Sequence, residues 1–520
     1  MRRLALLLAV AVALAVVAGF AWSSKPKASQ AAAVGVGQVA TVTSVTRSCP
    51  PAAPGAGTAT HISMIAVPSQ SAAAKGSTAV SSGSATLSAV PAAIAPPAPV
   101  KPAKGSKSKK TPAKTASATK TGSVTKTGSV AKTASAAPVT VSVPGQATTV
   151  TAPSAGDAAG TALAVTGQMA EGFEAEQATS AGMGLVSCSH PSSDMWFVGA
   201  GAPDVRLYLM NTGALAASVN VNILTDTGQQ NGLANAITVA PDQVMEENIS
   251  PYVVGAQAVA MEVQTSSGQI AASVWESNGT GSGAWVPESA EPSTTLVIPG
   301  LTVASSAARL FVTVPGQADA RVKVVAYTPA GAFEQFSTVP VQASAGATTP
   351  VTLSSLGASA AGLELTSNVP IVAGVLVAGS GIGSFTTGVA PVAEQGVVAG
   401  NPATAGLTVG LLLTAPGAAA TASVSVISAD GTVTSPASLQ NVTVAAERTL
   451  AVSVPRPPGR QPFSIVLRPG ADSGPLYAAR AVTSGSGGLT APLVSLLPVQ
   501  SALTKITLPA AQNSYTAVLP

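Results

Sequence analysis

The sequence predicts an all-β protein made of tandem β-sandwich modules of immunoglobulin-like type. These modules follow an N-terminal transmembrane or signal helix, and a disordered insert rich in Lys, Ala, Pro, Ser and Thr interrupts them. Three observations carry this prediction: an apolar stretch near the start, a low-complexity basic segment, and an internal repeat of about 100 residues with strand-like alternation. Aromatic residues make up only 3% of the chain, so its cores must be built mainly from Val, Leu, Ile and Ala.

The first 27 residues have the pattern of a signal anchor. Arg2 and Arg3 precede an uninterrupted apolar run over residues 4–22, which the polar sequence SSKPK follows. A charged start before an apolar stretch is typical of a secretory signal, and a run of this length also suffices to span a membrane. Both an uncleaved anchor and a cleaved signal stay open. We expect export in both cases. An uncleaved anchor would hold the protein at the cell membrane with an extracytoplasmic body, and a cleaved signal would give a secreted protein.

An N-terminal β region is expected over residues 39–90 and 138–187. Residues 39–46, 60–67 and 138–151 alternate β-branched or apolar residues with polar ones, as strands do. The acidic stretch at 169–177, which contains Glu171, Glu174 and Glu176, is expected to form a solvated turn with one or two turns of helix.

Residues 91–137 between these strands form the basic insert. The first 156 residues hold twelve Lys and three Arg and no acid, whereas the rest has ten basic residues and all 21 acids. The segment has nothing to bury and is expected to be disordered. Its candidate ligands for an anionic polymer are Lys107, Lys109, Lys110, Lys114, Lys120, Lys126 and Lys132.

Three interpretations of this insert remain open. It is a solvated spacer, it binds anionic wall polymers or lipid headgroups, or it docks on the acidic body of its own chain. Nucleic acid is not an expected partner, because the protein is exported and no aromatic residues lie between the lysines to stack on bases.

The internal repeat defines three modules, expected at residues 188–292, 293–395 and 396–520, the last with a C-terminal strand. Each contains a similar strand, and these read VRLYLMN at 205–211, ARLFVTVPG at 308–316 and VGLLLTAPG at 409–417. The turn that follows the next strand ends at Gly228, Gly331 and Gly431, at spacings of 103 and 100 residues. Short alternating strands with Gly, Asp and Pro turns are typical of β-sandwiches. Prolines near 287–299 and 391–402 predict linkers and a semi-rigid string of modules.

The chain has two cysteines, Cys49 and Cys188. A small even number in an exported protein indicates one disulfide, and two unpaired buried thiols are the alternative. Residues 39–90 alone are too few to bury a stable core. A bridge would join them to the strands after the insert, so that the insert becomes a long loop of one domain.

The sequence CSHPSSDMWFVG at 188–199 resembles a family of uncharacterised actinobacterial envelope proteins, which are signal-anchored, exported and carry a domain of unknown function. The sequence SCPP at 48–51, the N-terminal anchor and the later NTG, VAP and WVPES segments share this resemblance. The resemblance implies an envelope location and a pairing of Cys49 with Cys188. It implies no activity and no catalytic residues.

Few residues are candidates for chemistry, and we expect no catalytic residue, metal or cofactor. The two histidines, His61 and His190, are too few for a zinc site, and the three glutamates at 171–176 show no sign of lining a cleft. Asp226 and Asp430 lie in turns, where their carboxylates support the backbone.

Two tryptophans, Trp196 and Trp275, have two open interpretations. Their rings stack on a glycan at a sheet surface, or they pack against a neighbouring module.

We therefore expect a non-catalytic, exported envelope protein with a scaffold, adhesion or glycan-binding role. An accessory subunit of a membrane enzyme that builds envelope polysaccharide is one alternative, and a carbohydrate-active enzyme is another. The expected partners are an anionic cell-wall polymer or an envelope glycan, and the membrane through the N-terminal helix. The sequence does not predict an oligomeric state.

Overall fold

A computed structural model describes residues 38–54, 60–68, 83–93, 137–153, 159–179, 184–230, 233, 237–279, 282–302, 308–336, 339–353, 356, 360–377 and 382–508. The predicted signal anchor, residues 94–136 of the insert and its candidate lysines lie outside these ranges. No helix within them is long and apolar enough to cross a membrane.

The chain divides into two compact units. The larger unit is Val42–Thr504, and the smaller contains the strands β1 (Gln38–Thr41) and β37 (Lys505–Leu508). β1 and β37 pair antiparallel, with Gln38 opposite Leu508 and Thr41 opposite Lys505. The predicted strands near both ends of the chain thus form one two-stranded sheet.

The large unit is all-β, as predicted, and contains four pairs of sheets, each with a hydrophobic core between its two members. The helical segments among the described residues are short 3₁₀ turns. They are η2 (Gly167–Ala170), η3 (Ser250–Tyr252), η4 (Ala437–Leu439) and η5 (Gly488–Thr490).

The first sheet pair contains the strands on both sides of the insert. One sheet consists of β2 (Ser44–Cys49), β7 (Gly160–Thr166), β4 (Ser84–Val90) and β5 (Val139–Val141). The other consists of β6 (Thr148–Thr151), β3 (Thr60–Ala66), β8 (Phe173–Thr179) and β9 (Val186–Ser187). Alternate residues of these strands, such as Leu87 and Leu163 in one sheet and Met64 and Phe173 in the other, form the shared core.

The second sheet pair begins the repeat. Its larger sheet contains β13 (Gly228–Gln230), β12 (Ala217–Thr225), β16 (Val259–Ser267), β10 (Asp194–Gly199), β19 (Glu288–Ser289) and β14 (Ile237–Val239). Its smaller sheet contains β15 (Gln243–Asn248), β11 (Asp204–Asn211), β17 (Ala271–Ser277) and β18 (Gly283–Val286).

The third sheet pair is joined by one long strand, β26 (Ala361–Val377). Its first half pairs with β20 (Ser293–Leu301) and β22 (Ala320–Thr328), and its second half pairs with β21 (Ala308–Val314) and β27 (Ser384–Thr387). The remaining strands are β23 (Gly331–Glu334), β24 (Val341–Ala343) and β25 (Ala347–Thr352).

The fourth sheet pair ends the large unit. One sheet contains β28 (Gly396–Asn401), β34 (Phe463–Pro469), β30 (Ala420–Ile427), β31 (Val433–Thr434) and β32 (Val442–Val444). The other contains β33 (Arg448–Val454), β29 (Leu407–Ala415), β35 (Tyr477–Ser484) and β36 (Leu493–Pro498).

The three copies of the repeat have the same strand pairing. The first repeated strand pairs with a later strand of its own copy: β11 with β17, β21 with the second half of β26, and β29 with β35. The next strand also pairs with a later strand of its copy: β12 with β16, β22 with the first half of β26, and β30 with β34. The sequence similarity at 205–211, 308–316 and 409–417 therefore reflects one repeated topology.

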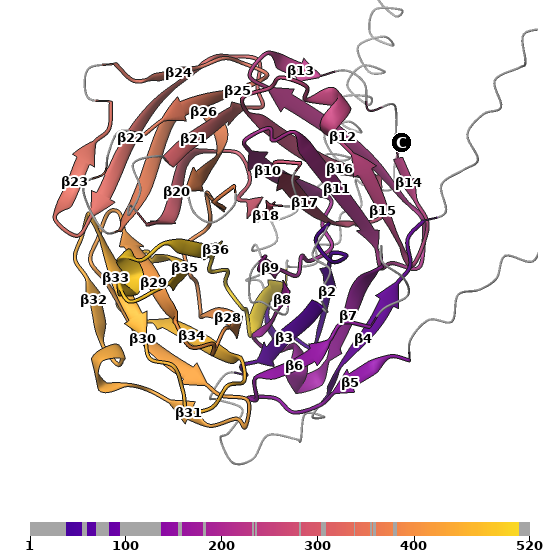
Figure 1. The fold of residues 1–520 in the computed structure, drawn as a ribbon, viewed down its shortest axis with the longest axis vertical. Coiled ribbons are helices and arrows are strands. Elements are labelled where there is room, and N and C mark those ends of the chain that lie inside the picture. The colour runs from indigo at the N-terminus through magenta and orange to yellow at the C-terminus, as the bar shows by residue number, and fades with distance from the viewer. Residues whose placement is uncertain are drawn as a thin grey trace, which may run out of the picture. The chain divides into compact units, whose positions relative to one another are not determined.

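The four sheet pairs form a closed ring of contacts within the large unit (Figure 1). Trp275 and Trp285 fill the interface between the first and second pairs, and Trp196 packs near Phe311 between the second and third. Leu412 and Leu496 of the fourth pair join the core of the third. Ile65 of the first pair packs with residues of the fourth, which closes the ring.

The prediction of a semi-rigid string of modules is wrong. The proline-marked segments belong largely to strands, because β19 and β20 occupy much of 287–299 and β28 begins at residue 396. The outward faces of the sheets carry enough apolar side chains to bury one another, so the sheet pairs join into one compact unit.

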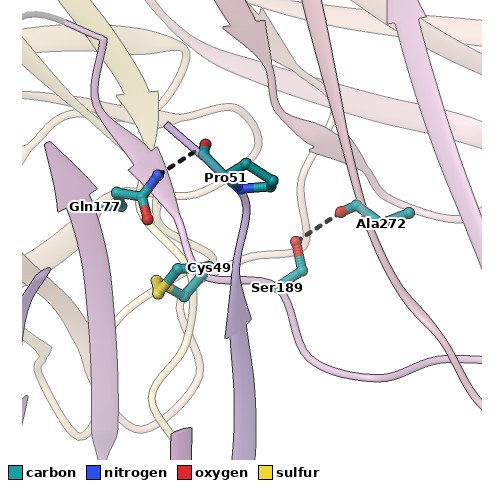
Figure 2. The surroundings of a disulfide bond; sticks show 6 residues. Cys49, Pro51, Gln177, Ser189 and Ala272 are labelled. Carbon is teal, nitrogen blue, oxygen red and sulfur yellow. Dashed lines mark hydrogen bonds between the residues drawn. A yellow bond between two sulfur atoms is a disulfide. The ribbon is translucent and has the colours of Figure 1, made fainter. Parts of the chain in front are cut away.

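The predicted disulfide between Cys49 and Cys188 is confirmed. Cys49 ends β2, and Cys188 follows β9, at a separation of 139 residues that spans the insert. Figure 2 shows the bridge where the chain leaves the first sheet pair: Ser189 Oγ donates to the carbonyl of Ala272 in the second pair at 2.8 Å. The bridge therefore joins β2 to the end of β9, and the residue after Cys188 contacts the second pair.

Candidate functional site

The closing interface between the first and fourth sheet pairs combines an apolar region, a buried ion pair and a pocket. Its first wall is the outward face of β3, β6 and β8, which points away from the core of the first pair. Its second wall is formed by β28 and its neighbours. At one end Ile65, Val67 and Ala147 pack against apolar residues of the fourth pair that include Val397 and Ala399.

A fully buried ion pair crosses this interface. Arg480 on β35 donates from Nη1 to Glu176 Oε2 on β8 at 3.1 Å, and their side chains are 0% and 2% exposed. The same nitrogen donates to the carbonyl of Gly400 at 2.9 Å. Glu176 thus links the first sheet pair to two strands of the fourth.

A β-bulge in β28 supplies two further donors to Glu176. The register of β28 with β34 shifts between Val398 and Asn401. Within that shift, the backbone N–H groups of Ala399 and Gly400 donate to Glu176 Oε1 and Oε2 at 3.3 and 3.2 Å. A bulge re-aims groups that would otherwise pair within the sheet. Here it directs two amides across the interface.

Burial raises the pKa of Glu176, and the charge of Arg480 and the two amides oppose that rise. Its neighbour on the same strand face, Glu174, has its pKa raised by burial to about 7, although Arg47 lies 3.5 Å away as an ion-pair partner. These carboxylates are buried in the interface and paired with arginines, and an unpaired charge there would be costly.

A pocket opens where the apolar part of the closing interface ends. It has a volume of about 390 Å³, and β3, β6 and the segment after β28 line it. Its polar lining includes His61, Ser63, Thr149, Thr151, Asn401 and Arg460. Among the described residues, no carboxylate lines this pocket, and the nearby carboxylate of Glu176 is paired with Arg480.

The predicted glycan-stacking residues lie elsewhere and are buried. Trp196 is 2% exposed and Trp275 is 4% exposed. Trp275 meets Trp285 edge to face, with ring centroids 5.1 Å apart. Neither predicted ring presents a free face to a sugar in this structure, so their position favours the alternative that they pack against a neighbouring module.

The prediction that residues 169–177 form a solvated acidic turn is wrong. Residues from Phe173 onward form the strand β8, and Glu171, Glu174 and Glu176 are each at most 3% exposed. Phe173 and Ala175 face the core of the first pair, so the two glutamates between them face outward. The fourth sheet pair covers that outward face, and Arg47 and Arg480 compensate the charges.

The other residues singled out by the sequence have no catalytic arrangement. Asp430 Oδ1 accepts from the backbone N–H of Thr432 and from Ser428 Oγ, which lowers the pKa of Asp430 to about 2. Asp226 Oδ1 accepts from the backbone N–H of Gln257. His190 is exposed near the disulfide. The described part of the chain contains no group of three or more metal-ligating side chains that could hold an ion.

A further buried carboxylate lies within the second sheet pair. Burial raises the pKa of Glu276 on β17 to about 7, although backbone N–H groups at residues 200–202 lower it. Its Oε2 accepts from the N–H of Ala200 at 3.1 Å. Gly199 allows this approach, because a Cβ there would lie 1.9 Å from Glu276 Oε1.

Sequence reasoning missed Arg480 and the bulge at residues 399–400. A signal was present for Arg480, because it interrupts the alternation of Ala478 and Val482, which face the core. A charged residue at a core-facing strand position indicates a buried partner. The bulge and the pocket had no such signal, since the bulge depends on pairing with β34, and the contact with Glu176 and the pocket join segments more than 200 residues apart.

The chain was also compared with known protein families. The model of a family of unknown function, DUF5719, matches residues 155–455, which is more than half of the chain. The chain belongs to the DUF5719 family. No curated protein and no solved structure matches it. The predicted membership of an uncharacterised family is thus confirmed, and the DUF5719 match includes β8, the bulge of β28 and Cys188, whereas Cys49 and Arg480 lie outside it.

Proposed function

We propose that this DUF5719 protein is a non-catalytic, exported scaffold of a bacterial envelope, built from four immunoglobulin-like β-sandwiches. The observation that carries the proposal is the closed ring of apolar interfaces. Such interfaces hold the four sheet pairs in fixed positions, which suits a protein that presents surfaces to large envelope components.

The disulfide supports the proposed compartment. Disulfides persist in oxidising environments and are rare in reducing ones. The bridge between Cys49 and Cys188 is buried, and it joins the strands on both sides of the basic insert. We therefore place the sheet pairs outside the cytoplasm, either held at the membrane by residues 1–27 or released after cleavage.

The burial of the acidic residues supports a non-catalytic role. A glycosidase needs two carboxylates beside its substrate. Glu174 and Glu176 are instead buried and paired with arginines, and no carboxylate is present among the described residues that line the pocket beside them. This arrangement favours a scaffold over a carbohydrate-active enzyme. An accessory role beside a polysaccharide-building membrane enzyme is a special case of the same proposal.

The proposed partner of the basic insert is an anionic wall polymer. We expect the full chain to bind purified cell walls in low salt, because lysines spaced along a chain attract phosphate or carboxylate groups. Binding should fall as salt rises, since counterions screen exposed charges beyond about 8–10 Å at physiological ionic strength. The measurement is a co-sedimentation assay across a salt series, with and without residues 101–136.

A matched control keeps the length of the insert. Replacing Lys114, Lys120, Lys126 and Lys132 with glutamine removes charge without shortening the chain. Loss of binding in this variant would assign the contact to the lysines. Binding that survives both changes would assign it to the sheet pairs, and a full chain that never sediments with walls would contradict the proposed partner.

A further inference from the structure

We propose that the pocket in the closing interface binds an acidic saccharide, a hydroxyl-rich unit that carries a carboxylate or a phosphate. The inference rests on the proposed envelope function and gives it a specific ligand site. The site differs from the predicted stacking residues Trp196 and Trp275, which are buried in other interfaces.

Along the two strands of one pocket wall, the outward-facing residues change from apolar to polar. The outward residues of β3 run from Val67 and Ile65, which pack against the fourth sheet pair, to Ser63 and His61, which line the pocket. On the neighbouring strand, Ala147 of the apolar contact is followed by Thr149 and Thr151 at alternate positions. Continued apolar residues would have sealed this end of the interface. The sequence instead places hydroxyls and an imidazole there.

The two strands of this wall present their polar groups together. His61 lies opposite Thr151 in the antiparallel register, and Ser63 lies opposite Thr149. The hydroxyls of Ser63 and Thr149 are 2.8 Å apart and form a hydrogen bond. Hydroxyl side chains can both donate and accept, so this wall can match the mixed donors and acceptors of a sugar ring.

The opposite wall comes from the segment after β28 and from residues 460–462. The backbone there is fixed by two contacts: Asn401 Nδ2 donates to the carbonyl of Phe463 at 3.0 Å, and Arg456 donates to that of Ala403 at 3.1 Å. Gly400 lets this wall approach the first, since a Cβ there would lie 3.1 Å from the Cβ of Ser63. The pocket is therefore held between two ordered walls.

The charge of the lining favours an anion. Arg460 contributes a guanidinium, and the described residues that line the pocket include no carboxylate. The nearest buried carboxylate, Glu176, is neutralised by Arg480. Guanidinium groups bind carboxylates and phosphates through paired hydrogen bonds. A volume of about 390 Å³ lies within the range of small-molecule sites, about 300–1,000 Å³.

The test measures binding of glucuronic acid, glucose 6-phosphate, glucose and inorganic phosphate to the full chain by saturation-transfer NMR and titration calorimetry. We expect at least one of the two acidic sugars to bind about tenfold or more tightly than glucose, because hydrogen bonds to charged groups are the stronger ones. Glucuronic acid and glucose 6-phosphate distinguish a carboxylate from a phosphate. Inorganic phosphate that binds as tightly as both sugars would reduce the pocket to a simple anion site and overturn the inference.

Two variants assign binding to the pocket. Arg460→Gln should remove the preference for the acidic sugar, whereas Arg321→Gln, at an exposed arginine of the third sheet pair, should leave it unchanged. Thr151→Trp should block the pocket and abolish binding of every sugar, with thermal melting used to verify that the variant is folded. Absence of binding in the wild type, or equal binding by wild type and Arg460→Gln, would overturn the inference. Neither result affects the scaffold proposal, which the wall-binding assay tests separately.

Discussion

Replacing Arg480 with methionine is expected to lower the free energy of unfolding by about 3–5 kcal/mol, the usual cost of leaving one member of a buried ion pair without its partner. The guanidinium of Arg480 is fully buried, and Glu176 would keep only the two backbone N–H donors of Ala399 and Gly400. Urea unfolding of the wild type and the variant at neutral pH measures the difference.

The double variant Glu176→Leu/Arg480→Met separates the cost of an unpaired charge from the value of the pair. Buried ion pairs replaced by apolar residues of similar size often leave stability unchanged or raise it. The Nε and Nη2 atoms of Arg480 have no hydrogen-bond partner among the described residues, so we expect the double variant to recover most of the loss. Arg321→Met is the exposed control and should change stability by about 0.5 kcal/mol or less. A loss below 1 kcal/mol for Arg480→Met would show that the pair is not buried as described.

Replacing Glu276 with glutamine is expected to remove a large part of the dependence of stability on pH. The pKa of this carboxyl is raised from its ordinary value of 4.5 to about 7 in the folded chain. Between these values the folded chain holds a proton that the unfolded chain has released. The stabilisation that the protonated Glu276 carboxyl gives to the folded chain is therefore fully present below about pH 4.5. It is lost as the pH rises through about 7. The loss amounts to about 3 kcal/mol, because one pKa unit corresponds to about 1.4 kcal/mol.

Unfolding free energies at pH 5 and pH 8 test this expectation. The wild type should be less stable at pH 8 than at pH 5, and Glu276→Gln should show a smaller difference because its amide does not ionise. The raised pKa values of Glu174 and Glu288 act in the same direction and remain in the variant. Glu334→Gln, at an exposed glutamate of the third sheet pair, is the control. Equal pH dependence in the wild type and Glu276→Gln would show that this carboxylate does not hold its proton in the folded state.

The strands and the repeat could be predicted because they depend on local alternation. The similar strands at 205–211, 308–316 and 409–417 occupy equivalent places in their sheets, and the even cysteine count correctly indicated one bridge. The closed ring could not be predicted in this way. An outward-facing residue such as Trp275 or Glu176 has the same local pattern whether solvent or another sheet pair covers it.

The candidate site could not be predicted from local sequence patterns, because it is assembled from distant segments of the chain. Its parts are Ser63 on β3, Gly400 on β28 and Arg460 in a loop, brought together only when the first and fourth sheet pairs meet. The acidic residues at 171–176 were interpreted as solvated because isolated glutamates usually are. Arg47 pairs with Glu174, and Arg480 together with the amides of Ala399 and Gly400 compensates Glu176.

The most direct test of the closed ring is hydrogen exchange at the backbone amides of Ala399 and Gly400. Neither residue has a partner in the register between β28 and β34, and their N–H groups donate across the closing interface to Glu176. Strong protection of both amides in the wild type, lowered in Glu176→Leu/Arg480→Met because that variant removes their acceptor, is the result that a closed ring predicts. Rapid exchange at both amides in the folded wild type, with the neighbouring amides of β34 protected, would contradict it and show that the first and fourth sheet pairs do not meet.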